Sequence, residues 1–422
     1  MTRKPHRRLT GSLPGAARIA VATALLSRVI PSILLAIALI CVSALPFPFS
    51  HPPDGLPVAL AGPYDRPDRP RVSAYAAALM EWQTGTLLYE KNAFTRMHPA
   101  SVTKMMTALL ALENGRLEDL VTVSKEAAGQ PGSSMYLKAG DVYTLEDLLY
   151  GLMLNSGNDA AWAIAEHVGG TAEAFFEMMN ARAKSLGAIN TRFRNPHGLT
   201  DPNHYTTAFD LALIARTCLR HPFFRHLVAT KEKDVIDAEG RVRTQLGNTN
   251  RLLWLYLGAD GVKTGTTESA GQCLVSSATR GDTRMLSVVL YSQDRWSDSA
   301  AILDYGFENF RVARLLPAGE TMLELPCKGA IQERVAIVPR TDLLACVPRN
   351  STGLDLRFEL PEKIGPCRGG TVVGRAMVFL GDDVVGRTEL MTGAWVSPKT
   401  PVSLAARAAS WLTRQAVRLR AF

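Results

Sequence analysis

The spacing of apolar residues predicts a helical region in the middle of the chain. Between residues 143 and 233, apolar side chains recur with the period of an amphipathic helix. This period predicts helices at 145–154, 159–168, 171–186 and 208–218. A further helix is expected over 101–113, because Asn114-Gly115 is a typical helix stop.

Segments with strand character stand on both sides of these helices. Residues 74–82 and 86–89 are predicted to form a β-hairpin, and 271–279 and 285–291 a second pair of strands before a helix at about 299–310. Strands at both ends with helices between them favour an α+β domain, with one sheet closed by the two ends and a separate helical block. We expect the chemistry in the cleft between sheet and block.

After about residue 312 the pattern changes to short strands and turns. We expect strands at 321–325, 334–338, 355–360, 371–379 and 384–389, which together indicate a small all-β domain. The predicted organisation is a signal peptide or anchor (1–45), a proline-rich linker (46–71), an α+β domain (72–311), the β domain (312–396) and a basic amphipathic helix (397–422).

The N-terminal segment predicts export. A basic stretch precedes an uncharged apolar run over 29–45, which is the pattern of a secretory signal with a long basic region. The alternative is an uncleaved anchor, since about 17–20 apolar residues can just span a bilayer. In both cases the body of the protein is exported across the cytoplasmic membrane and works outside it.

The charge distribution favours a membrane surface over nucleic acid as a partner. The net charge is +8, but 11 of the 47 basic residues lie in 1–50 and 396–422, where there is no acid. The remaining 36 basic residues face 39 acidic ones. Over 401–422, Trp411, Leu412 and Phe422 share one helical face beside arginines, so this segment is predicted to lie peripherally on the membrane. A terminal helix packed on its own protein is the alternative.

The cysteines indicate neither a metal site nor a fixed disulfide pattern. None of the six shows Cys-x-x-Cys or zinc-type spacing, and the histidines show no ligand spacing, so we expect no metal and no cofactor. A disulfide among the last three is open. The six are Cys41, Cys218, Cys273, Cys327, Cys346 and Cys367.

Ser101-Val102-Thr103-Lys104 is the one Ser-x-x-Lys in the chain. Residues three apart on a helix share a face, so Lys104 can reach the Ser101 hydroxyl. A serine becomes a good nucleophile when a neighbouring base takes its proton, and lysine can be that base where its surroundings disfavour the ammonium form. Alone the motif is weak, because about one such tetrapeptide is expected by chance in a chain of this length.

Two later motifs strengthen this hypothesis. Ser156-Gly157-Asn158 follows 55 positions after Ser101 in a predicted turn, and Lys263-Thr264-Gly265 follows 107 positions later, on a predicted strand edge. Each tripeptide alone is ordinary turn or strand chemistry. In this order, Ser-x-x-Lys, Ser-x-Asn and Lys-Thr-Gly are the set of the penicillin-recognising serine enzymes.

The sequence resembles the D-alanyl-D-alanine carboxypeptidases among the low-molecular-mass penicillin-binding proteins, from about residue 72 to 395. The resemblance implies a serine β-lactamase/transpeptidase-like fold, a peptidoglycan stem peptide as substrate and inhibition by β-lactam antibiotics. Beyond the three motifs it rests on further segments: His98-Pro99-Ala100, Asn195-Pro196-His197-Gly198-Leu199, Asp260-Gly261-Val262, Ala270 to Val275 and Asp294-Arg295 through Phe307.

Carried over to the matching positions, the resemblance implies a catalytic set. Ser101 would attack the carbonyl between the two terminal D-alanines, and Lys104 would take its proton. Ser156 and Lys263 would relay a proton to the leaving amine, and Asn158 would hold the substrate amide.

It also implies a substrate-binding set of Thr264, Gly265, Thr266 and Arg295. Thr264 and Arg295 match positions that grip the terminal carboxylate, which suits a guanidinium. The backbone N–H groups of Ser101 and Thr266 would form the oxyanion hole.

Three alternatives remain open. A class A β-lactamase would need a deacylating glutamate, and residues 187–230 contain none. An endopeptidase for peptide cross-links would use the same residues, although the pattern around Ser156 favours the carboxypeptidase. An inactive scaffold whose β domain engages other cell-wall proteins is disfavoured by the three intact motifs.

Overall fold

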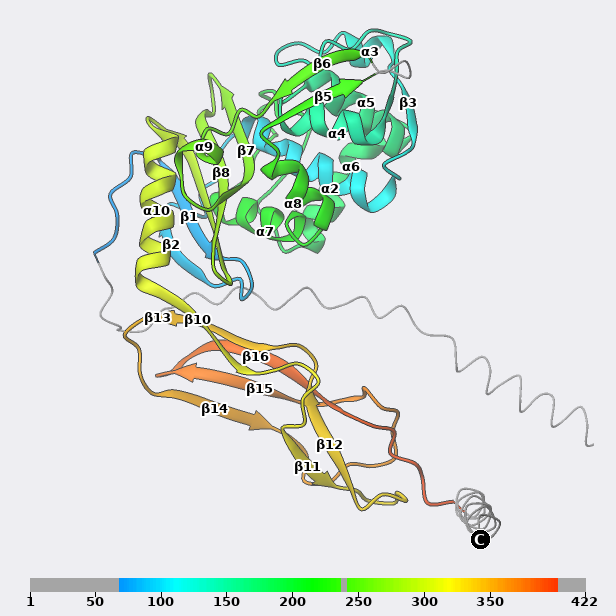
Figure 1. Ribbon diagram of the computed structural model, residues 1–422, viewed down its shortest axis with the longest axis vertical. Helices are drawn as coiled ribbons and strands as arrows, with labels where there is room; N and C mark the ends of the chain where they lie inside the picture. The colour runs from blue at the N-terminus through cyan, green and yellow to red at the C-terminus, as the bar shows by residue number, and fades with distance from the viewer. Residues whose placement is uncertain (1–67, 237–240, 401–422) are drawn as a thin grey trace, which may run out of the picture. The chain divides into compact units, whose positions relative to one another are not determined.

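The computed structural model describes residues 68–236 and 241–400 (Figure 1). Its first part contains a five-stranded antiparallel sheet in the order β2-β1-β9-β8-β7. The strands are β1 (Ala76–Glu81), β2 (Leu87–Lys91), β7 (Ala259–Thr267), β8 (Gly271–Arg280) and β9 (Thr283–Ser292). The two ends of the α+β region therefore share one sheet, as predicted, and β7 is an edge strand.

Alternating side chains of the sheet pack against two different layers. Ala76, Ala78 and Met80 of β1 join the core of the helical block. Ala77 and Leu79 join the core beneath α10 (Arg295–Asn309) on the other face. Since both faces are covered (Figure 1), six consecutive residues in the middle of β8 and of β9 are buried.

The helical block contains the predicted helices and one that was not predicted. The predicted ones are α2 (Lys104–Asn114), α4 (Leu145–Met153), α5 (Asn158–Gly169), α6 (Ala172–Ser185) and α7 (Ala208–Cys218), and the additional helix is α8 (Pro222–Ala229). Threonine side chains cap three of them, with Thr144, Thr171 and Thr207 each accepting a hydrogen bond from a backbone N–H of the first turn. Shorter elements are α3 (Lys125–Ala128), α9 (Leu252–Leu255), and the hairpins of β3 (Leu120–Thr122) with β4 (Val142–Thr144) and β5 (Glu232–Ile236) with β6 (Val242–Gly247).

Two helix boundaries differ from the prediction. The helix expected to begin at residue 101 is divided into a 3₁₀ turn, η1 (Ala100–Thr103), and α2, which begins at Lys104. The helix expected from about 299 begins at Arg295. Asp294 caps it by accepting hydrogen bonds from the N–H groups of Trp296 and Ser297.

The second part is all β. One sheet has the order β11-β12-β16-β15-β14 and a second pairs β10 with β13. The elements are β10 (Phe310–Leu316), β11 (Leu323–Pro326), β12 (Arg334–Pro339), β13 (Leu343–Pro348), β14 (Leu354–Glu359), β15 (Val372–Leu380) and β16 (Asp383–Thr392). Five of these match predicted strands; β10 and β13 were missed, and the exact boundary at 311/312 stays a prediction.

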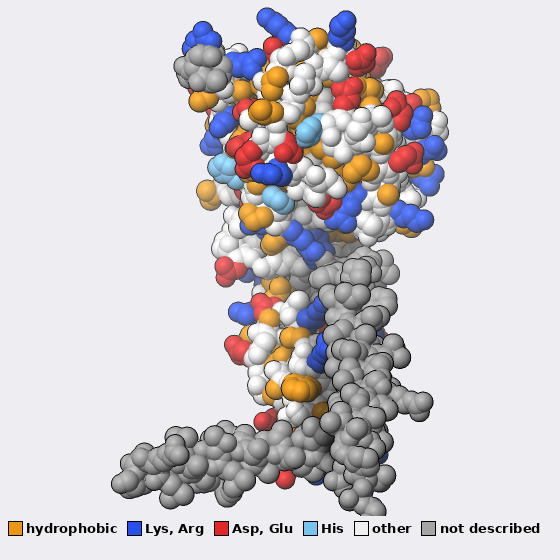
Figure 2. Space-filling view, turned by 90° about the vertical axis from the view of Figure 1, so that its right-hand side faces the viewer, with side chains coloured by type: hydrophobic (Ala, Val, Ile, Leu, Met, Phe, Trp, Pro, Cys, Tyr) orange, Lys and Arg blue, Asp and Glu red, His pale blue; other side chains and the backbone are white. Residues whose placement is uncertain are grey.

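The predicted signal or anchor, most of the linker and the helix over 401–422 lie outside the described residues. Within 68–236 and 241–400, every helix is too short or too polar to cross a membrane. On the face drawn in Figure 2, basic and acidic side chains are interspersed, as expected from the near balance of charge in the body. The five cysteines of the described ranges are all free thiols.

Candidate active site

The turn before α2 positions Ser101 over Lys104. Ala100 has a φ of +50°, so the chain reverses sharply as it enters η1. Ser101 stays partly exposed, whereas Lys104 is completely buried. The three-residue spacing places Lys104 Nζ 3.0 Å from Ser101 Oγ. The predicted pair of hydroxyl and amine is therefore within hydrogen-bonding distance.

The Lys104 amine is surrounded by oxygen atoms. Besides Ser101 it reaches Asn158 Oδ1 at 2.7 Å and the backbone carbonyl of His197 at 2.9 Å. Burial lowers the pKa of Lys104 well below its usual value, and the nearby Lys263 lowers it further, while Asp159 opposes the change. The environment therefore favours an amine that can accept a proton.

The turn between α4 and α5 brings the second motif to the same place. Ser156 has a φ of +63° and a buried hydroxyl without a hydrogen-bond partner among the described residues. Two residues later, Asn158 spans the gap between Lys104 and the carbonyl of Pro131, to which its Nδ2 donates at 2.5 Å. The motif thus provides one oriented amide and one hydroxyl free to interact with a substrate.

A buried carboxylate holds this turn in place. Asp159 accepts hydrogen bonds from Ser134 Oγ at 2.6 Å and from the N–H groups of Met135 and Leu137 at 2.9 and 3.1 Å. These contacts attach the segment around Met135 to the start of α5. Sequence reasoning missed Asp159, although an acid directly after Ser156-Gly157-Asn158, at a helix start, was a usable signal.

The third motif enters along β7. Lys263 is buried and its amine has no partner among the described residues. Burial, together with the charge of Arg295, lowers the pKa of Lys263 to about 7. Thr264 shares a hydrogen bond of 2.7 Å with Thr249. A Cβ on Gly265 would lie 3.0 Å from the backbone nitrogen of Ser101, so β7 passes directly against the nucleophile turn.

Arg295 lies beside the end of β7, at the first residue of α10. Its Nη1 donates to the carbonyl of Gly265 at 2.9 Å and to Thr266 Oγ1 at 2.9 Å. The guanidinium contacts Thr266 rather than the Thr264 hydroxyl, which is paired with Thr249. The structure thus brings the predicted site residues together from η1, α2, the α4–α5 turn, β7 and α10.

Two further contacts were not identified from sequence. Gly198 has a φ of +90°, and a Cβ there would lie 1.8 Å from the carbonyl oxygen of Ala100. Because of this close approach, the carbonyl of the neighbouring His197 accepts a hydrogen bond from Lys104 Nζ. Thr249 orients Thr264. Gly198 lies in a segment that carried the resemblance, but its spacing to Ser101 has no meaning until the chain is folded.

Comparison with known proteins places this arrangement in a family. The model of the family described as D-alanyl-D-alanine carboxypeptidase, peptidase S11, matches residues 64–294, which is more than half of the chain. The chain belongs to the peptidase S11 family. The model of the penicillin-binding protein 5 C-terminal domain matches residues 310–397. The predicted family and the predicted fold class are both confirmed.

Members of the family from several bacteria are similar over most of their length. D-alanyl-D-alanine carboxypeptidase DacC of Escherichia coli (strain K12) is 37% identical over 325 residues, 73% of this chain and 80% of the relative. DacF of Bacillus subtilis (strain 168) is 35% identical over 298 residues, 69% and 76% of the two chains.

Solved structures show the same fold. Penicillin-binding protein 5 from Haemophilus influenzae has a TM-score of 0.70 at 31% identity, covering 78% of this chain and 99% of its own. The DD-transpeptidase of Streptomyces K15 has a TM-score of 0.55 at 38% identity and covers 57% of this chain and all of its own.

Proposed function

We propose that Ser101 is the nucleophile with which this serine-type D-alanyl-D-alanine carboxypeptidase of the cell wall removes the terminal D-alanine from peptidoglycan stem pentapeptides. The observation that carries the proposal is the 3.0 Å contact between Ser101 Oγ and the buried Lys104 amine, whose pKa is held well below its usual value. A neutral amine at that distance can accept the hydroxyl proton as the oxygen attacks.

In acylation, Ser101 Oγ bonds to the carbonyl carbon between the two D-alanines, and its proton passes to Lys104. The N–H groups of Ser101 and Thr266 stabilise the oxyanion, in keeping with the close passage of β7 at Gly265. The C–N bond then breaks, and the leaving amine takes a proton through Ser156 and Lys263. Both of these have buried polar atoms without partners in the described structure. Water hydrolyses the ester, releasing the shortened peptide.

The substrate is held on both sides of the reacting bond. Asn158 presents its amide toward the substrate from the start of α5, where Lys104 and Pro131 fix its orientation. The terminal carboxylate is bound by Thr264 and Arg295, and the guanidinium of Arg295 is positioned by its hydrogen bond to Thr266 Oγ1. Recognition of a free terminal carboxylate is what the substrate of a carboxypeptidase requires.

β-Lactams follow the same path to an acyl-enzyme on Ser101 and are released slowly. Rapid release in a class A β-lactamase depends on a glutamate that activates water. Residues 187–230, where it would stand, contain no glutamate. We therefore expect stable labelling by fluorescent penicillin.

The enzyme acts outside the cytoplasmic membrane and binds its surface through residues 401–422. The support is the basic, acid-free sequence of this segment with its Trp411 and Phe422. The test is flotation of the purified protein, with and without residues 401–422, on vesicles that contain anionic lipid. Only the longer protein should float with the vesicles, and less of it at high salt.

The catalytic proposal is tested with a purified protein and a pentapeptide ending in D-Ala-D-Ala. The wild type should release D-alanine, and Ser101→Ala should reduce this at least about 10³-fold and abolish penicillin labelling. Ser185→Ala, on an exposed part of α6, is the matched control and should retain both. D-alanine release by Ser101→Ala at the wild-type rate would refute the assignment. Faster cleavage of a cross-linked dimer than of the pentapeptide would favour the endopeptidase.

A further inference from the structure

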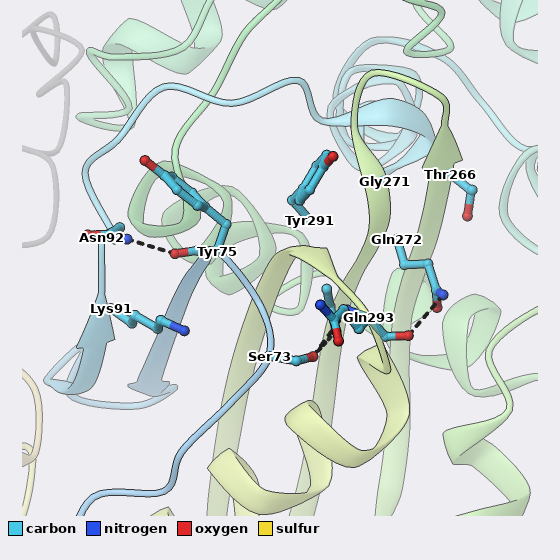
Figure 3. Close-up of a pocket in the computed structure, with 10 residues that line it drawn as sticks. Ser73, Tyr75, Lys91, Asn92, Thr266, Gly271, Gln272, Tyr291 and Gln293 are labelled. Atoms are coloured by element: carbon cyan, nitrogen blue, oxygen red, sulfur yellow. Dashed lines mark hydrogen bonds between the residues drawn. The ribbon is translucent and has the colours of Figure 1, made fainter.

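A hollow begins at Thr266, one of the proposed substrate-binding residues, and follows the ends of the sheet strands (Figure 3). Its volume is about 560 Å³. Thr266, which bonds Arg295 in the active site, forms one end. The principal lining residues beyond it are Gln272, Tyr291, Tyr75, Lys91 and Asn92.

The hollow crosses the whole sheet. Gln272 of β8 is the register partner of Thr266 on β7. Tyr291 lies near the end of β9, Tyr75 just before β1, and Asn92 just after β2. Neighbouring strands are about 4.8 Å apart, so four strand spacings correspond to roughly 19 Å. This length exceeds what the two terminal residues of a peptide need and suits a segment of a polymer.

The charged side chain and two of the amide side chains of the hollow each donate a hydrogen bond to a backbone carbonyl of the protein. The ammonium of Lys91 donates to the carbonyl of Val72 at 2.8 Å. Gln272 Nε2 donates to the carbonyl of Gln293, and Asn92 Nδ2 to that of Tyr75, at 3.1 and 2.9 Å. No Asp or Glu lines it. The surface is therefore polar, with Lys91 as the one charged side chain of its lining and with amide oxygens left to accept hydrogen bonds.

Two tyrosine rings stand out from this surface. Tyr75 and Tyr291 are 51% and 52% exposed, and both extend upward in the view of Figure 3. Tyr291 has a φ of +52°, an uncommon conformation for an aromatic residue. Half-exposed aromatic rings beside neutral hydrogen-bonding groups match the chemistry of a sugar. Pyranose rings present apolar C–H faces that pack on aromatic rings, and hydroxyl and acetamido groups that bond to amides and phenols.

We infer that this hollow binds the saccharide chain of the cell-wall polymer, the N-acetylated amino sugars to which the stem peptide is attached. The inference rests on the proposed function, since the sugar must be linked to a peptide that reaches Ser101. A second stem peptide fits less well, because its amines would need acidic partners, which the lining lacks, and its several carboxylates would meet a single cation, Lys91.

The test compares two substrates for the full-length enzyme: a free pentapeptide ending in D-Ala-D-Ala, and the same peptide attached to its N-acetylglucosaminyl-N-acetylmuramic acid disaccharide. The wild type should show about tenfold higher kcat/KM for the disaccharide substrate, mainly through KM. Tyr75→Ala and Tyr291→Ala should bring the ratio close to one without changing turnover of the free peptide. Tyr291→Phe, which keeps the ring, should restore most of the preference.

Tyr136→Ala is the matched control. Tyr136 is also exposed and has a φ of +62°, but it lies outside this hollow, so the preference should survive its loss. Equal kcat/KM for the two substrates in the wild type would overturn the inference, as would an equal gain from a cross-linked peptide without sugar. Penicillin labelling and free-peptide turnover depend on the proposed catalytic residues around Ser101 and not on this hollow. If the wild type shows neither penicillin labelling nor free-peptide turnover, the proposed function fails. If it turns over both substrates with equal kcat/KM, only the inference about the saccharide fails.

Discussion

At the scale of the residue, two buried lysines belong to the proposed catalytic set, and they differ in their hydrogen bonds. Lys104 contacts three oxygen atoms, while Lys263 has no partner among the described residues. A buried amine without a partner is costly for folding, because it loses hydration without gaining hydrogen bonds. Lys263 is therefore expected to serve catalysis at the expense of stability.

Replacing Lys263 by Met should stabilise the protein and inactivate it. Burial lowers the pKa of Lys263 in the folded protein to about 7 from its ordinary value of 10.5, so the unfolded chain binds more protons than the folded protein between these two pH values. Stability contributed by this group therefore rises as pH rises from about 7 to 10.5. Lys263→Met should remove that rise and add a few kcal/mol at pH 7, while slowing penicillin acylation at least about 100-fold.

Urea unfolding at pH 7 and pH 10, together with acylation rates, measures these effects. Lys125→Met, in α3 and away from the site, is the control for a lysine with no expected gain. If Lys263→Met were less stable than the wild type at pH 7, the cost ascribed to the buried amine would be wrong.

At the scale of the element, the site depends on how closely the segment 195–199 approaches η1. Gly198 combines a φ of +90° with contact to the Ala100 carbonyl. Only a residue without a Cβ allows this approach, which keeps the His197 carbonyl 2.9 Å from Lys104 Nζ. The position of the catalytic amine thus depends on a loop more than 90 residues away in sequence.

Gly198→Ala should therefore be far more damaging than an ordinary glycine replacement. We expect a loss of at least about 3 kcal/mol in unfolding free energy, or a displaced loop with at least tenfold slower acylation. Gly140→Ala is the matched control, since its φ of +89° is nearly the same and a Cβ there meets nothing within 4 Å. Gly140→Ala should lower the free energy of unfolding by only about 1–2 kcal/mol. Thermal unfolding and acylation rates of both variants make the comparison, and similar losses would show that backbone strain alone decides.

At the scale of the whole molecule, buried neutral histidines should make the fold sensitive to acid. Burial lowers the pKa of His197 to about 3 and that of His204 to about 4, from 6.5. His197 stacks on Trp162, and His204 hydrogen-bonds Thr103 beside the nucleophile turn. Between the folded pKa of each histidine and 6.5, the unfolded chain binds more protons than the folded protein. The free energy of unfolding therefore falls as pH falls below 6.5.

Each histidine should lower the free energy of unfolding by about 2 kcal/mol once the pH has fallen to 5. The double variant His197→Gln, His204→Gln should show a flatter dependence of unfolding free energy on pH between 7 and 5. His226→Gln, on the exposed side of α8, should behave like the wild type. Urea unfolding at the two pH values provides the measurement. An unchanged slope in the double variant would show that other groups govern the acid transition.

Local patterns in the sequence determined most helices, the β1–β2 hairpin, the β8–β9 pair and the three motifs, whereas the short hairpins β3–β4 and β5–β6 were not predicted. A helical period needs only near neighbours, so the extents of α7 and α4 could be predicted almost to the residue. The missed β13 is a continuous apolar run that ends in proline, without the alternation that distinguishes a strand. The four-residue error at the start of α10 arose because the cap at Asp294 was overlooked.

The tertiary structure alone decided the state of each proposed catalytic group. Three features of the site depend on segments that are distant in sequence. They are the Lys263 amine without a partner among the described residues, the contact of the His197 carbonyl with Lys104, and the contact of Arg295 with Thr266. Burial and pKa are collective properties of all surrounding atoms, so no local pattern specifies them. The sequence alone named the reacting groups because the motif order is characteristic. Whether their amines are desolvated, uncharged and within hydrogen-bonding distance depends on the folded chain.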